Sequence, residues 1–183
     1  AFLKSGIIEA HGLEEFIDGV KALSMQNPPM GNRILIVTNG GGFGVIVADH
    51  CSENGLEVPP PSPQLKEKLG SKFFAFYVVN NPVDLTGSAC DSDYYIALNA
   101  CMIESDEYDA AIIIPLMAPQ GMTEKVVDLI TETMKRSRKP AVICTVGGAF
   151  TMKIKGLFEE REFPVYPSPE RSARAMSMLL KRR

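Results

Sequence analysis

The chain has 183 residues, of which 45% are hydrophobic and 22% are charged, so it is long and apolar enough to fold around a sizeable core. A net charge of −3 argues against a nucleic-acid surface, and the basic clusters at 135–139 and 181–183 are short enough to be solvated helix ends. No membrane-length apolar run, leader pattern or CxxC spacing is found, which predicts a cytoplasmic protein with four reduced cysteines and no metal site.

Residues 1–30 are expected to be a lead-in helix and linker from a preceding domain. Phe2, Leu3, Ile7 and Ile8 are apolar enough to pack on a neighbour. Apolar residues then recur at 13, 16, 17, 20 and 23, a helical spacing that predicts a helix over 13–24 with this face buried. Two prolines in 27–31 end the helix, so the main domain is placed at 31–183. Because the chain opens on Ala and not on Met, we expect a fragment of a longer protein.

The stretch 32–51 contains the strongest local signal. Residues 34–37 form an apolar, β-branched run that predicts a buried parallel strand. A glycine-rich turn follows, and apolar residues then resume on one face of a helix. The turn consists of Asn39, Gly40, Gly41, Gly42, Phe43 and Gly44. Free amides at the start of a helix, together with its dipole, predict an anion site that faces a phosphoryl group or a carboxylate.

Two known phosphate motifs fit this turn badly. The dinucleotide pattern GxGxxG lacks its third glycine because residue 45 is Val, although Glu57 keeps a ribose contact open. A Walker A loop is excluded, since no Lys-Ser or Lys-Thr closes the turn. A purely structural tight turn remains the alternative to an anion site.

Helices and strands are expected to alternate along the rest of the chain. Proline and glycine punctuation and apolar periodicity divide it into short segments. Predicted strands lie at 56–58, 73–79, 110–116, 140–146 and 163–166; predicted helices lie at 64–69, 91–104, 121–136, 149–161 and 169–180. In the helix over 91–104, Tyr95, Leu98 and Met102 are expected to point inward.

Such alternation predicts an open, three-layer α/β sheet of about five parallel strands in the flavodoxin-like order 2-1-3-4-5. Ligands of these sheets bind beyond the carboxyl ends of the strands, which places four loops on one rim: 39–44, 81–87, 115–121 and 147–150. The second rim loop contains Asn81, Pro82, Asp84 and Gly87. Asp84 is its main carboxylate and either bridges two loops or contacts a ligand.

No catalytic set is found on this rim. His50 lies on the helix after the glycines, where we expect exposure to solvent, and His11 reads as a polar linker residue. The rim contains no Ser-His-Asp set, no pair of histidines at metal spacing and no Lys near the first loop.

Several motifs in order resemble the C-terminal flavodoxin-like domain of NDP-forming (ADP-forming) acyl-CoA synthetases, in the succinyl-CoA synthetase superfamily. They are GNRILIVTNGGGFGVIVADHC, NNPVDLTG, DAAIIIP, RKPAVICTVGG and FPVYPSPERSARAM, and they cover nearly the whole chain. The glycine turn followed by NPVDLTG is the specific part. The opening AFLKSGIIEAHGLEEFID resembles the segment that follows the phosphohistidine motif Ser-His-Thr-Gly in this family.

The resemblance implies the reaction acyl-CoA + phosphate + NDP = acid + CoA + NTP, through a phosphohistidine. It implies that 39–44 bind the phosphohistidine or the acid substrate of a neighbouring domain, and that 81–87 supply a second loop. No cofactor is expected on this domain, because the family binds CoA in a separate domain and ADP or ATP with Mg in an ATP-grasp domain. The fragment has no catalytic residue of its own, so we expect it to be inactive alone, and the intact enzyme to be an oligomer.

Two other hypotheses remain open. One is a regulatory synthetase-like domain of a protein acyltransferase, which the same residues would fit. The other is a free-standing module that binds a small ligand. The length of the parent gene, and whether Ser-His-Thr-Gly lies just upstream, would discriminate the synthetase from the acyltransferase domain.

Overall fold

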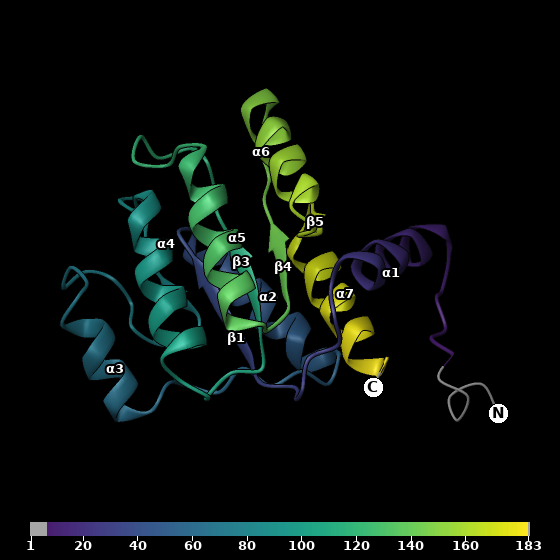
Figure 1. The fold of residues 1–183 in the computed structure, drawn as a ribbon, viewed down its shortest axis with the longest axis horizontal. Helices are drawn as coiled ribbons and strands as arrows, with labels where there is room; N and C mark the ends of the chain where they lie inside the picture. Colours follow the sequence, from purple (N-terminus) through teal and green to yellow (C-terminus); the bar gives the residue numbers. More distant parts are fainter. Residues whose placement is uncertain (1–6, 183) are drawn as a thin grey trace.

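The computed structural model describes residues 7–182 and contains a five-stranded parallel sheet in the order β2-β1-β3-β4-β5 (Figure 1). This order confirms the predicted flavodoxin-like fold. Phe2 and Leu3 of the expected lead-in lie outside the described residues. The strands are β1 (Ile34–Thr38), β2 (Val83–Asp84), β3 (Ala110–Ile114), β4 (Ala141–Cys144) and β5 (Val165–Tyr166).

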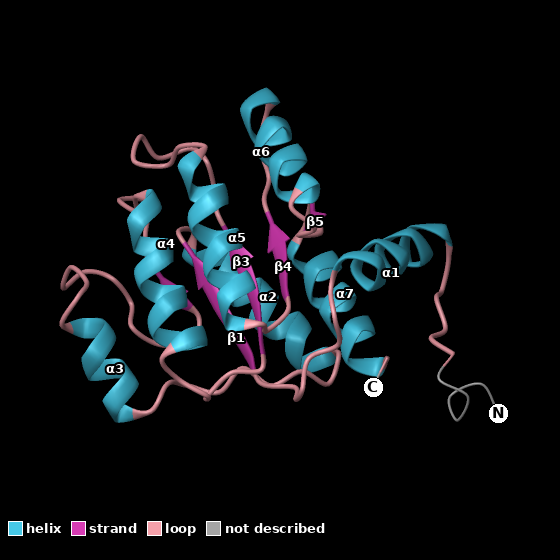
Figure 2. Ribbon diagram, in the orientation of Figure 1, coloured by secondary structure: helices cyan, strands magenta, loops and turns pink. Residues whose placement is uncertain are grey.

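Helices cover both faces of the sheet (Figure 2). Alternate residues of β1 point to opposite faces: Leu35 and Val37 belong to one apolar core with α3 to α6, while Ile34 and Ile36 belong to the other with α2 and α7. The helices are α1 (Leu13–Met25), α2 (Gly41–Glu53), α3 (Pro63–Gly70), α4 (Asp91–Leu98), α5 (Lys125–Ser137), α6 (Ala149–Glu160) and α7 (Pro169–Lys181). A π-helical turn, η2 (Asn99–Ile103), continues α4. No helix in the described part of the chain has the length and apolarity needed to cross a membrane.

The predicted strand over 73–79 is wrong, and β2 lies in the following segment, which we had placed in a rim loop. Residues 73–79 form turns whose aromatic rings contact one another: the rings of Phe74 and Phe76 stack with centroids 5.4 Å apart. Only Val78 makes a bridge, antiparallel to Asp84. The aromatic composition of 73–79 favoured a strand. In the structure these rings pack on one another and not in a sheet, and Phe74 and Phe76 are more than half exposed.

Helix α1 forms where predicted, but the prediction that its apolar face is buried is wrong. Leu13, Phe16, Ile17 and Val20 are 50% to 74% exposed. The opposite face packs on α7, because Gly19 lets Met178 approach closely and the buried Asp18 accepts two hydrogen bonds from the Arg171 guanidinium, at 2.8 and 2.7 Å. A buried ion pair and a glycine contact therefore decide the orientation of this helix.

Smaller differences concern element ends and one side chain. The predicted edge strand at 56–58 is reduced to a single bridge of Glu57 to Arg33, and α5 begins at Lys125, later than predicted. Tyr95 is 37% exposed, whereas its neighbour Tyr94 is fully buried in the core.

The cysteines are free, as predicted, and three of them are buried. Burial raises the pKa of the Cys51 and Cys101 thiols to about 12 and that of Cys144 to about 11. These three thiols are therefore protonated at neutral pH. Cys90 differs from the prediction of core thiols, because it is only partly buried at the start of α4.

Candidate anion site at the glycine turn

The glycine turn places unpaired amides at the start of α2. Gly40 is the extended N-cap residue, and its carbonyl accepts hydrogen bonds from the amides of Phe43 at 2.9 Å and Gly44 at 3.3 Å. Within the described residues, the amides of Gly41 and Gly42 have no hydrogen-bond partner. Two N–H donors at the positive end of a 13-residue helix are thus free, and that they bind an anion stays a prediction.

Three of the four glycines permit close packing of neighbouring loops. A Cβ on Gly40 would lie 2.5 Å from the Leu116 side chain, and one on Gly41 would lie 2.5 Å from an Asp84 oxygen. A Cβ on Gly44 would lie 2.9 Å from Thr38 and 3.1 Å from Pro82. None of these glycines has a positive φ, so the turn needs them for their small size and not for a left-handed backbone.

Gly42 differs from the other three glycines. A Cβ added there would meet nothing within 4 Å, and the residue is exposed. The packing of the described residues therefore does not require glycine at this position. The space beside the Gly42 amide is open to a group from outside the chain.

Thr38 and Asn39 hold the turn in place, and neither side chain is left for a ligand. The Thr38 hydroxyl accepts a hydrogen bond from the Gly40 amide at 3.0 Å and donates one to the Gly40 carbonyl at 3.1 Å. The Asn39 side chain, 4% exposed, donates to the Leu116 carbonyl at 2.9 Å and accepts from its amide at 2.8 Å. Asn39 thus ties the first rim loop to the loop after β3, and only its backbone belongs to the candidate site.

Asn81 was predicted on the rim, but it lies beside β1 and below the carboxyl edge. Its side chain accepts a hydrogen bond from the Ile36 amide at 2.9 Å and donates to the carbonyls of Ile34 at 2.8 Å and Pro59 at 3.0 Å. Strand β2 is only two residues long and pairs with only part of β1. The Asn81 side-chain amide therefore makes the hydrogen bonds to β1 that a longer β2 strand would make. Asn81 is therefore a structural residue.

The remaining residues of the second loop lie closer to the turn. Pro82 packs against Gly44, and Gly87 is exposed with open space around it. Asp84 ends β2, and its carboxylate accepts a hydrogen bond from the Thr86 amide at 2.8 Å while facing Gly41. The negative charge of Asp84 would repel an anionic ligand on its side of Gly41. The open approach to the turn is therefore the one beside Gly42.

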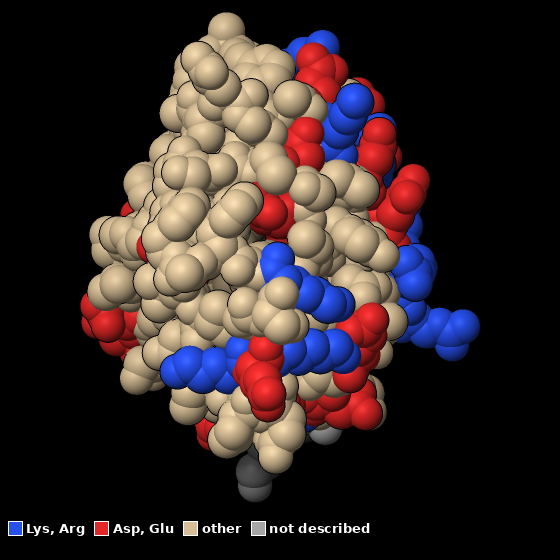
Figure 3. Space-filling model, turned by 90° about the vertical axis from the view of Figure 1, so that its left-hand side faces the viewer, with Lys and Arg blue, Asp and Glu red and all other residues tan. Residues whose placement is uncertain are grey.

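Two segments expose apolar side chains: the first turns of α2, next to the glycine turn, and the loop before β2. Val45 and Ile46 on the first turns of α2, and Phe74, Phe76 and Val78 on the loop before β2, are 46% to 63% exposed. Sequence reasoning missed the loop part of this surface because it assigned 73–79 to a buried strand. Figure 3 shows a broad uncharged stretch over the upper left of this side of the molecule, with charged side chains gathered at the right and below. Backbone amides, and not side-chain cations, are the donors at this site.

Two titratable groups outside the turn, Tyr94 and His50, have structural roles. The Tyr94 hydroxyl donates to the Ile114 carbonyl at 2.7 Å, and burial raises the pKa of this phenol well above its ordinary value, so it stays protonated. His50 lies at the other end of α2, where its ring contacts Glu53 at 2.8 Å and is partly exposed. Among residues 7–182 no cluster of three or more His, Cys, Asp or Glu has the geometry to hold a metal ion.

Comparisons with known proteins show which family the chain resembles. Residues 34–173 match the model of the Ligase-CoA domain. The chain is 32% identical to the alpha subunit of ADP-forming acetate–CoA ligase I of Pyrococcus furiosus, over 99% of the chain and 39% of that subunit. It is 23% identical to the ADP-forming 4-hydroxybutyrate–CoA ligase of Nitrosopumilus maritimus, over 99% of the chain and 26% of that protein.

A solved structure of similar fold is the dinucleotide-forming acetyl-coenzyme A synthetase 1 of Ca. Korarchaeum cryptofilum, in complex with phosphate and ADP. The TM-score is 0.89 at 31% identity, over 99% of this chain and 39% of that one. The chain therefore spans about two fifths of that synthetase and of the Pyrococcus subunit.

Proposed function

Since the chain belongs to the Ligase-CoA domain family, we propose that it is one domain of an NDP-forming acyl-CoA synthetase. The reaction of the whole enzyme would be acyl-CoA + phosphate + NDP = acid + CoA + NTP. The observation that carries the proposal is the pair of unpartnered amides of Gly41 and Gly42 at the carboxyl edge of the sheet, with open space beside Gly42.

In this enzyme the glycine turn would stabilise a phosphohistidine, or the acid substrate, presented by a neighbouring domain. Each hydrogen bond from a neutral amide to a charged group contributes about 1.5–3 kcal/mol, and the dipole of a helix adds about 0.3–1 kcal/mol when exposed and up to about 2 when partly buried. The exposed apolar side chains Val45 and Ile46, next to the turn on α2, would help to exclude water when that domain docks, which strengthens both terms.

The other components would lie outside this chain. A CoA-binding domain, a domain with the phosphorylated histidine and an ATP-grasp domain with ADP or ATP and Mg would complete the enzyme, and this domain would bind no cofactor itself. The share of the Pyrococcus subunit that the chain covers, and the phosphate and ADP named for the Korarchaeum complex, support this division. Residues 1–30 would connect the domain to the preceding one. Both curated relatives are named as CoA ligases, which favours the synthetase over a regulatory domain of an acyltransferase.

The substitution Gly42→Val in the intact enzyme tests the role of the turn. The Cβ of a valine at this position would meet nothing within 4 Å, so the side chain would enter the open space beside the turn. We expect the yield of phosphoenzyme, measured with labelled phosphate and acyl-CoA, to fall about tenfold or more, at about 1.4 kcal/mol per decade. Nucleotide affinity should be unchanged.

His50→Ala is the matched control, because His50 lies on the same helix but at its far end. This variant should phosphorylate normally. Normal phosphorylation of Gly42→Val, or loss of it in His50→Ala, would place the chemistry elsewhere.

The 183-residue chain alone should show no NDP-dependent synthesis, since phosphoryl transfer needs a positioned nucleotide, metal and nucleophile.

A further inference from the structure

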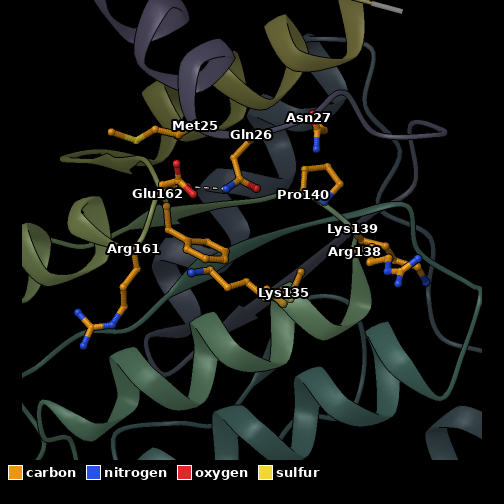
Figure 4. A pocket seen from close by; sticks show the side chains of 11 residues that line it. Met25, Gln26, Asn27, Lys135, Arg138, Lys139, Pro140, Arg161 and Glu162 are labelled. Carbon is orange, nitrogen blue, oxygen red and sulfur yellow. Dashed lines mark hydrogen bonds between the residues drawn. The ribbon is translucent and has the colours of Figure 1, made fainter.

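A cavity of about 370 Å³ lies at the amino edge of the sheet, away from the glycine turn (Figure 4). It is lined by the ends of three helices: α1 with the residues after it, α5 with the residues up to Pro140, and the turn after α6. Its volume lies within the range of small-ligand sites. This cavity, called the basic pocket below, is lined by four cations: Lys135, Arg138, Lys139 and Arg161.

Two of these cations have no partner among residues 7–182. Lys139 donates to the Ser105 carbonyl at 3.0 Å, and Arg161 forms an ion pair with Asp128 at 2.7 Å. Within the described residues, the side chains of Lys135 and Arg138 take part in no ion pair or hydrogen bond. Figure 4 shows Lys135 across the middle of the pocket, with Arg161 at one end and Arg138 at the other. The one carboxylate in the lining belongs to Glu162.

The backbone at the pocket is unusual at two residues. Arg138 has a φ of 58° and Glu162 a φ of 68°, and each follows the last turn of a helix, where glycine is the usual residue. Only one other non-glycine residue in the described chain, Thr86, has a positive φ. The sequence therefore keeps a charged side chain at both positions although glycine would cost less stability.

The base of the pocket is apolar and held in place. Met134, Pro140 and Phe163 line it and are buried. The Gln26 side chain joins two of its walls, because it donates to the Glu162 carbonyl at 2.6 Å and accepts from the Ala141 amide at 2.9 Å. The cavity is thus preformed, with cations at its rim and an apolar base.

We propose that the basic pocket binds a small organic phosphate. Lys135 and Arg138 supply positive charge to the phosphate group from opposite sides of the pocket, and the apolar part of the ligand lies against Pro140 and Phe163. Lys139 and Arg161 add positive charge while they stay bonded to their protein partners. This inference does not rest on the proposed function, because the pocket and the glycine turn lie at opposite edges of the sheet.

The test is a titration of the ¹⁵N-labelled 183-residue chain with phenyl phosphate at constant ionic strength, followed by amide chemical shifts. We expect saturable shifts at Arg138, Glu162 and Phe163, and weaker binding of inorganic phosphate, which lacks an apolar part. Shifts confined to Gly41 and Gly42 would overturn the proposal while supporting the glycine-turn site, so the two hypotheses fail separately. Equal shifts with sodium chloride alone would also overturn it.

Variants separate a binding site from a surface charge effect. Arg138→Gly should weaken phenyl phosphate binding about tenfold, because a charged hydrogen bond is lost, and should raise the unfolding midpoint, because glycine suits the left-handed backbone. Lys135→Gln should weaken binding similarly. Arg136→Gln is the control: this neighbouring cation is exposed and does not line the pocket. If Arg136→Gln weakened binding as much as Arg138→Gly, the proposal would fail.

Discussion

The glycine turn and the amino edge of the sheet are held in place by different chemistry. At the glycine turn, uncharged groups join the loops: Asn39 bonds to the Leu116 backbone, and Gly44 packs on Pro82. At the amino edge, ion pairs join the segments that enter the strands, such as Arg33 with Asp109, whose two side-chain hydrogen bonds measure 2.9 and 2.8 Å. The basic pocket lies at this second edge.

The difference shows that one fold can offer an anion two kinds of site. At the glycine turn the donors are backbone amides, which do not change charge with pH. Affinity for an anion there depends on close packing of the loops and on the helix dipole. At the basic pocket the donors are exposed side-chain cations, so affinity should fall as salt screens them. Substitutions that disturb packing should thus affect the carboxyl edge, and changes of charge should affect the amino edge.

The largest effect on stability is expected from Asn81→Ala, in the segment that leads to the carboxyl edge. The change leaves the Ile36 amide and the Ile34 carbonyl, both in a fully buried strand, without partners, and it also removes a bond to Pro59. An unsatisfied buried group costs about 1–3 kcal/mol, so the free energy of unfolding should fall by about 3 kcal/mol or more. Urea unfolding followed by circular dichroism measures this loss.

Asn80→Ala is the control for this prediction. Asn80 is the preceding residue in the chain, is exposed, and makes no side-chain hydrogen bond in the described structure. Its substitution should leave the unfolding midpoint nearly unchanged. Equal effects of the two variants would mean that the amide of Asn81 does not replace the missing strand ladder.

A smaller effect is expected from Gly44→Ala in the glycine turn. The new methyl group would crowd Thr38 and Pro82, and overpacking of this kind costs about 1–3 kcal/mol, partly offset by the better helix propensity of Ala. Gly42→Ala should instead raise stability by up to about 1 kcal/mol, because its methyl group meets open space. Thermal unfolding of the two variants compares them directly, and a shift in the same direction would contradict this account of the turn.

Local sequence signals predicted the architecture well. The apolar runs of β1 and β3 are buried throughout, and proline and glycine breaks mark most element ends. Alternation of helices and strands predicted the parallel sheet, although β2 lies in a segment that was assigned to a loop. The glycine turn and its position at the start of α2 were also predicted. These features depend on residues close together in the chain, which a sequence displays directly.

Features that depend on distant contacts were not predicted. Which glycines pack against Asp84 and Pro82, and which one faces open space, is set by a loop about forty residues away. The pairing of Asp18 with Arg171 turned the apolar face of α1 outward, although the periodicity was read correctly. The role of Asn81 required knowing that β2 is short, and the basic pocket required three helix ends to meet.

The smallest effect is expected at the amino edge, from Asp109→Asn. The hydrogen bond from Arg33 is the main cause that holds the pKa of the Asp109 carboxyl below its ordinary value of about 3.9. The Arg33 side chain is 43% exposed, which screens the pair, so the loss at pH 7 should be about 1 kcal/mol.

The sign of the pH dependence follows from that lowered pKa. Above about pH 5 the carboxylate is ionised in both the folded and the unfolded chain, and its full contribution to stability is present. As the pH falls through the folded-state pKa, the folded chain also takes up the proton and the contribution disappears. The stability difference between the wild type and Asp109→Asn should therefore be constant from pH 7 to about pH 5 and shrink below about pH 4. Urea unfolding at each pH measures this difference.

Asp106→Asn is the control, since Asp106 is fully exposed and lies 3.7 Å from Lys139, and it should change neither the stability at pH 7 nor its profile. A difference that grows as the pH falls would mean that the Asp109 carboxylate destabilises this edge, and the contrast with the uncharged contacts of the glycine turn would be lost.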